Sequence, residues 1–304
     1  MSKLSVNFSR ASNKCRKLST IKISFGLLHL RITDCTKLSI GNDPIHYCLE
    51  WTAEKENDGT REYVTWPDQS QEIVQKHSEN PLDSMKELYL YVRSLMGIAI
   101  ISVDLFMNSF EGQCREIVDS LRSTFDEVTI LRIFGKDQRQ DEIEYILDNM
   151  KHTNQLEVNV DTMEKLPLKI PETIERLQIE FGSWLTLDYM MNLKMSTIVL
   201  WNTFLTNEVL NVIFKSWIEM KSHQNLEYLE MNLRNLEDCV EVAMKDIPYE
   251  IRHSIPTPDP AYTLVGGIFD VTRKDGQPAL IGVYEDPTGF FLSMCPRLPL
   301  LSPE

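Results

Sequence analysis

Residues 174–179 read IERLQI, residues 195–200 read MSTIVL and residues 226–231 read LEYLEM. Each run has an apolar residue at its first, fourth and sixth positions, and the last two of these are typical of a short strand with one buried face. The same apolar-x-apolar pair recurs through the middle of the chain and decides the fold. It occurs at Ile101/Val103, Leu131/Ile133, Leu156/Val158, Leu177/Ile179, Ile198/Leu200 and Leu229/Met231.

The first residues of successive pairs are 30, 25, 21, 21 and 31 positions apart. Amphipathic segments fill most of these gaps, although Pro167 and Pro171 exclude a long helix over residues 161–173. A strand and a helix in each repeat is the arrangement of leucine-rich-repeat solenoids. We therefore expect an α/β fold in which leucine-rich-repeat-like units form a curved, mostly parallel sheet. The strict signature is not met, because Arg234 stands where a buried Asn or Cys is expected.

The two ends of the chain favour α+β structure. Short alternating runs before residue 52 predict a small N-terminal β-meander, followed by a surface excursion with one strand near Val64. Asn80 can cap a helix that has Pro81 in its first turn. Turn residues between late strand-like runs predict a C-terminal antiparallel β-meander. We expect four regions along the chain. Residues 1–20 form a short N-terminal tail, and residues 21–100 hold the β-meander, the surface excursion and the helix. Residues 101–236 hold the strand–helix repeats, and residues 237–304 hold a linker and the C-terminal β-meander.

Composition limits the class of partner. The net charge of −14 argues against a general nucleic-acid binder, because neutralising phosphates needs a basic surface. No apolar run approaches the ~18 residues of a membrane span. The six cysteines have no tight spacing and are expected to be reduced thiols, which favours a cytoplasmic or nuclear protein. The basic first 40 residues leave a mitochondrial transit peptide as the alternative.

No pattern for catalysis or for a cofactor is present. The chain has no nucleophile elbow, zinc-protease pair, phosphate-binding loop or dinucleotide fingerprint, so we expect neither an enzyme nor a cofactor. His29, Cys35, His46 and Cys48 come nearest to a metal-binding set, but their spacing matches no common zinc template. We therefore expect them to be ordinary strand residues.

Several segments resemble the nematode F-box-associated (type 2) family. They are residues 185–190 (LTLDYM), 196–202 (STIVLWN) and 205–211 (LTNEVLN), and residues 271–276 (VTRKDG) with 279–281 (ALI) resemble that family's closing hairpin. The likeness covers residues 128–295. Val209 and Ile213 stand within segments where this chain departs from the family's preferred residues.

The resemblance implies a protein-binding module similar to the substrate-recognition region of an SCF-type ubiquitin ligase receptor, with an unidentified target protein. Residues 8–18 (FSRASNKCRKL) look like the tail of an F-box, so a Skp1-type adaptor is expected to dock only if the motif is completed upstream. Two alternatives stay open, a ligase-independent module that has lost its F-box and an enzyme of unrecognised type. Trp201 and Asn202, just past a repeat strand, are candidate target-binding residues, and the alternative for Trp201 is burial in the core.

Overall fold

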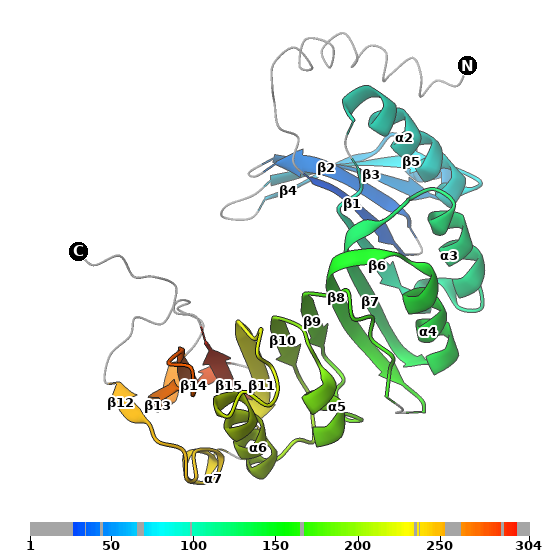
Figure 1. The fold of residues 1–304 in the computed structure, drawn as a ribbon. Helices are drawn as coiled ribbons and strands as arrows, with labels where there is room; N and C mark the ends of the chain where they lie inside the picture. The colour runs from blue at the N-terminus through cyan, green and yellow to red at the C-terminus, as the bar shows by residue number, and fades with distance from the viewer. Residues whose placement is uncertain are drawn as a thin grey trace. The chain divides into compact units, whose positions relative to one another are not determined.

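The computed structural model describes residues 27–33, 35–42, 45–65, 70–97, 99–164, 167–233, 236, 238–252, 263–286 and 289–296. The chain divides into two compact units, Met1–Phe110 and Glu111–Glu304. Figure 1 shows the elements of each unit. Residues 1–20, where the sequence predicts an F-box tail, and the proline-dense residues 255–260, where it predicts a linker, lie outside the described residues.

The first unit holds a mixed sheet in the order β6-β1-β2-β3-β5-β4. Strands β1, β2 and β3 form the expected antiparallel meander, whereas β6 runs parallel to β1 and β5 runs parallel to β3. The strands are β1 (Leu27–Ile32), β2 (Lys37–Asn42), β3 (Ile45–Thr52), β4 (Arg61–Thr65), β5 (Ser70–His77) and β6 (Ser102–Phe106).

Helix α2 (Pro81–Met96) begins where the sequence predicts. The Asn80 side chain accepts a hydrogen bond from the Asp83 amide at 3.3 Å, and Pro81 occupies the first turn, where a missing N–H costs nothing. Met85 and Tyr89 bury one face of the helix, which contacts β3. Among the described residues, the structure has no helix whose length and apolar character would suit a membrane crossing.

The second unit holds a sheet in the order β12-β13-β14-β15-β11-β10-β9-β8-β7. Its strands are β7 (Val128–Gln138), β8 (His152–Thr162), β9 (Arg176–Ile179), β10 (Thr197–Leu200), β11 (Tyr228–Leu233), β12 (Glu250–Arg252), β13 (Thr263–Thr272), β14 (Pro278–Asp286) and β15 (Gly289–Cys295). Its helices are α3 (Cys114–Arg122), α4 (Gln140–Asn149), α5 (Leu187–Asn192), α6 (Asn207–Ile218) and α7 (Cys239–Ala243).

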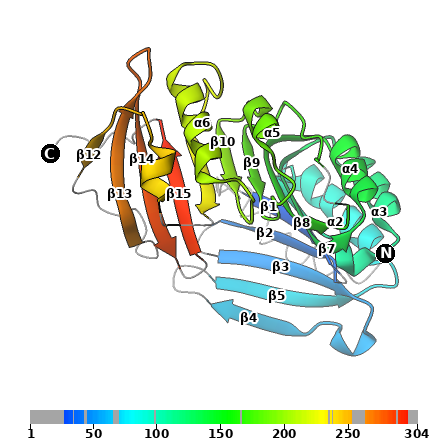
Figure 2. The same cartoon turned by 90° about the horizontal axis from the view of Figure 1, so that it is seen from below.

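Strands β7 to β11 are parallel, and the repeat positions read from the sequence pair in register. Leu131, Leu156, Leu177, Ile198 and Leu229 lie side by side across the five strands, and all are buried. Helices α3 to α6 lie over one face of these strands (Figures 1 and 2). Within the second unit, the helices thus cover one apolar face of the parallel strands, and each strand–helix repeat packs against the next.

The expected mostly parallel sheet is wrong for the molecule as a whole. Strands β13, β14 and β15 are joined by short connections and can therefore pair only antiparallel, and β15 continues antiparallel onto β11. Among the described strand pairs, antiparallel ones outnumber parallel ones. The fold is mixed α/β, without the regular alternation of a leucine-rich repeat, because the residues described between β8 and β9 form no helix.

The surface excursion is a second correction. Residues 53–80 contain β5 as well as β4, the strand expected near Val64. Strand β5 reads SQEIVQKH, and every one of its side chains is half-buried. A strand that buries neither face fully shows no period-two alternation, so its sequence does not reveal it.

Candidate binding site at the carboxyl ends of the parallel strands

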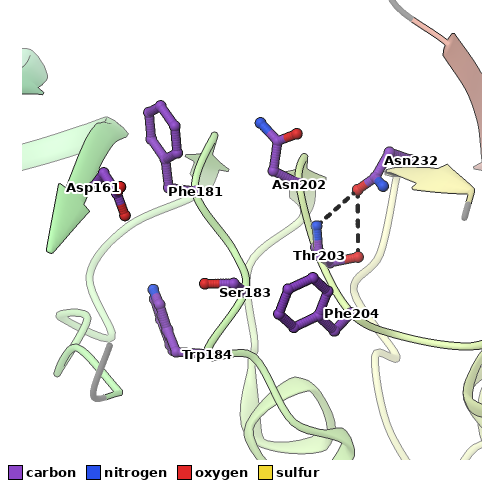
Figure 3. Close-up of a pocket in the computed structure, with 8 residues that line it drawn as sticks. All are labelled: Asp161, Phe181, Ser183, Trp184, Asn202, Thr203, Phe204 and Asn232. Carbon is purple, nitrogen blue, oxygen red and sulfur yellow. Dashed lines mark hydrogen bonds between the residues drawn. The ribbon is translucent and has the colours of Figure 1, made fainter. Parts of the chain in front are cut away.

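The carboxyl ends of β8 to β11 meet at one edge of the second unit's sheet, because neighbouring strands run parallel. Residues at the ends of these strands and in the loops that follow them line an open hollow of about 610 Å³. Figure 3 shows its lining, which is Asp161, Phe181, Ser183, Trp184, Asn202, Thr203, Phe204 and Asn232. In parallel α/β sheets, ligands bind characteristically outside the carboxyl ends of the strands.

The loop after β9 carries three lining residues and is held by Gly182. The Gly182 amide donates a hydrogen bond to the Trp201 carbonyl at 3.0 Å, and the Gly182 carbonyl accepts one from the Leu185 amide at 3.0 Å. A Cβ at Gly182 would lie 2.7 Å from Leu185 Cδ1 and 2.9 Å from Thr203 Cγ2. Only glycine therefore lets this loop approach the loop after β10 so closely.

The loop after β10 is held in turn by β11. The Thr203 amide donates a hydrogen bond to Asn232 Oδ1 at 2.9 Å, and the Thr203 hydroxyl lies 3.3 Å from the same oxygen. Thr203 is buried, so these groups depend on Asn232 rather than on water. The loop after β9 is therefore held by the loop after β10, and the loop after β10 is held by β11.

Three aromatic side chains line the pocket, and they differ in how much of their surface is exposed to solvent. Trp184 is mostly buried, and Tyr189 packs against it edge-to-face at 4.9 Å between ring centroids. The Tyr189 hydroxyl donates to the Leu168 carbonyl at 2.6 Å, and burial raises its pKa. Phe204 is 57% exposed, so much of its side chain faces solvent. In Figure 3 the rings of Trp184 and Phe204 flank the Ser183 side chain, and the Phe181 ring lies farther from it.

The structure separates the two binding residues predicted from the sequence. Asn202 is exposed, lines the pocket and has a φ of 49°, a backbone conformation that Asn tolerates better than most residues. Trp201 is half-buried, neither in the core nor in the pocket lining. Its Nε1–H donates to Glu230 Oε1 at 3.0 Å, and its ring contacts Phe291 at 6.3 Å between centroids.

Trp201 belongs to the face of the sheet opposite the helices, which we call the helix-free face. Its residues on β7 to β11 alternate with the buried repeat positions, and most are half-buried, whereas Arg176 is exposed. They include Glu157, which pairs with Arg132 at 2.9 Å, and Glu230, which accepts a hydrogen bond from the Tyr228 hydroxyl at 2.5 Å. The helix-free face is polar and aromatic, and it adjoins the pocket through Trp201 and Asn202.

Other reactive side chains do not gather into a site. No group of His, Cys, Asp and Glu among the residues described could hold a metal ion. His29 instead hydrogen-bonds the Ser102 hydroxyl and contacts Asp104 at 3.1 Å. Burial raises the pKa of Cys114 to about 12 and that of Cys239 to about 11, so both thiols stay protonated at neutral pH.

Comparison with known proteins found a similarity in one segment of the second unit. Residues 165–231 match the model of a family described as F-box associated. This F-box associated segment runs from the end of the β8–β9 connection through β11, and it supplies the pocket residues from Phe181 to Phe204. It lies within the 128–295 range expected from sequence and does not reach residues 1–20. No curated protein matches the chain.

Sequence reasoning found only Asn202 among the pocket residues. Phe181 and Asn202 occupy equivalent places, each two positions after the last apolar residue of its strand, Ile179 and Leu200. Asn232 follows Met231 directly. Comparing strand ends across repeats would have indicated Phe181 and Asn202, whereas Asn232 does not share their offset and Phe204 has no repeat counterpart that marks it.

Proposed function

We propose that this chain is a non-catalytic protein-recognition module whose target docks on the strand-end pocket and on the adjoining helix-free face. The observation that carries the proposal is an open pocket with three aromatic rings, Phe181, Trp184 and Phe204, inside the F-box associated segment. Aromatic side chains supply large contact areas and dominate binding energy in protein interfaces.

The chemistry of the lining supports binding rather than catalysis. Of the lining residues that the structure describes, Asp161 alone is titratable, and neither His nor Cys accompanies it there. General acid–base or nucleophilic catalysis needs a second group poised to transfer a proton or to attack. Rigid strand ends and interlocked loops instead provide a preformed surface, which lowers the entropic cost of binding.

The F-box associated match supports a role in substrate recognition by a receptor of SCF type. In this proposal the strand–helix units stack as leucine-rich repeats do, and the target lies outside their open edge. A Skp1-type adaptor would join through an F-box supplied upstream, and the module would work in the cytoplasm or nucleus, without nucleic acid or membrane as a partner.

Affinity capture with matched variants tests the proposal. Phe181→Ala and Phe204→Ala together remove two rings from the pocket, whereas Val212→Ala removes an exposed apolar side chain from α6. We expect specific partners that the wild type and the Val212→Ala control both retain and that the double variant loses. Equal capture by all three proteins would overturn the assignment of the target to this pocket.

A further inference from the structure

We propose that the strand-end pocket takes the cationic side chain of a lysine or arginine in a basic segment of the target. This inference rests on the proposed function and names the chemistry of the partner. The inference depends on two features of the same pocket, its aromatic rings and the carboxylate of Asp161.

Among the residues that the structure describes, the pocket lining presents one carboxylate and no cation. Asp161 comes from the end of β8, and the remaining lining residues are uncharged. The faces of Phe181, Trp184 and Phe204 carry the negative side of the aromatic quadrupole, which attracts a cation placed over the ring. A lysine or arginine stem can also lie along the rings while its charged end reaches the carboxylate.

Residues beside the pocket favour more than one basic side chain of the target. Glu180 directly follows β9 and, like Asp161, lies at the carboxyl end of its strand. The hydrogen bond from the Trp201 amide to the Ile179 carbonyl, at 2.8 Å, places the Glu180 backbone beside Trp201. A basic segment crossing this edge would therefore meet a second carboxylate and a fourth ring.

Charge complementarity selects this occupant over the alternatives. The chain has a net charge of −14, which attracts basic partners over long distances and repels acidic or phosphorylated ones. A purely apolar segment would cover the Asp161 carboxylate without contributing a polar contact of its own, which costs desolvation energy.

Fluorine NMR of the full chain labelled with 5-fluorotryptophan provides the test. The Trp184 resonance is assigned by its loss in Trp184→Phe, and the probes are short glycine peptides carrying one lysine, arginine, norleucine or glutamate. We expect the lysine and arginine peptides to shift the Trp184 resonance with an affinity about tenfold higher than that of the norleucine peptide. Equal binding of lysine and norleucine peptides, or tighter binding of the glutamate peptide, would overturn the inference.

Charge variants supply a second readout. Asp161→Asn should weaken the lysine peptide about fivefold and leave the norleucine peptide unchanged. Glu172→Gln removes the same charge from an exposed carboxylate before β9, at the opposite end of the strand, and should leave both peptides unchanged. An Asp161→Asn protein that still prefers lysine as strongly as the wild type would contradict the role of the carboxylate.

The two proposals fail separately. If the Phe181/Phe204 double variant loses its targets while lysine and norleucine peptides bind alike, the protein-recognition function stands and the cationic ligand is wrong. If the lysine preference is found but the double variant keeps every target, the pocket binds cations and is not the target site.

Discussion

The side-chain oxygen of Asn232, in β11, accepts a hydrogen bond from the backbone amide of Thr203 at 2.9 Å. Thr203 follows β10 and is only 2% exposed to solvent. One strand-end loop of the pocket is thus positioned by the neighbouring strand. The contact links the packing of adjacent strands directly to the shape of the proposed binding site.

Asn232→Ala should lower the free energy of unfolding by about 1–3 kcal/mol, because the buried Thr203 amide loses its acceptor. Asn232→Asp keeps an acceptor oxygen at the same place and should retain most of the stability at neutral pH. Urea denaturation followed by circular dichroism measures both. Equal losses in the two variants would show that side-chain shape, not the hydrogen bond, is what Asn232 contributes.

Gly182→Ala should destabilise the protein by about 1–3 kcal/mol, since the added Cβ would overlap Leu185 and Thr203 at less than 3 Å. It should also separate the loops after β9 and β10 and weaken target capture. Adding Thr203→Ser removes the Cγ2 atom while keeping the hydroxyl, so the double variant should regain part of the loss. A fully stable Gly182→Ala protein would contradict the close approach.

The turn after β13 should make stability depend on pH in the acid range. Arg273 donates to Asp275 at 2.9 and 2.7 Å, and this contact lowers the pKa of Asp275 from 3.8 to about 2. A carboxyl whose folded pKa is depressed stabilises the fold above its unfolded pKa, and this contribution is lost as pH falls from 3.8 through about 2. The stability difference between the wild type and Asp275→Asn should therefore shrink across that window, as measured by urea midpoints.

A second pH dependence should arise from His223. Burial lowers the pKa of His223 below 6.5, so the folded protein favours the neutral ring. Its stabilising contribution is fully present above pH 6.5 and is lost as pH falls through the folded pKa. The backbone of His223 has a φ of 52°, which Asn tolerates, so His223→Asn should fold and lose less stability than the wild type on acidification.

The comparison of His223→Asn with the wild type isolates one histidine. Burial also lowers the pKa of His152, and both proteins retain that residue. Thermal unfolding at several pH values between neutrality and pH 5 would measure the difference. Parallel curves for the two proteins would mean that His223 does not contribute to the pH dependence.

Much of the core was readable from the amino-acid sequence. The repeated apolar pairs gave the positions that pair in register from Leu131 to Leu229, because a strand buried on one face by helices must repeat its apolar residues every second position. The cap at Asn80, the early meander and the terminal hairpins were also predicted from local turn and capping chemistry.

By itself, the sequence determined the repeat strands, the mixed α/β class and the position of Asn202 just past a strand, since these depend on local periodicity. Tertiary structure alone decided that Asp161, Trp184, Phe204 and Asn232 line one pocket, because they belong to the ends of different strands or to the loops after them and meet only through sheet register. It also decided that β15 pairs antiparallel with β11 and that the polar strand β5 joins the sheet beside β3. Contacts between segments that are distant in the sequence produce no local sequence pattern. The pocket depends on such contacts, so no single stretch of the sequence predicts it.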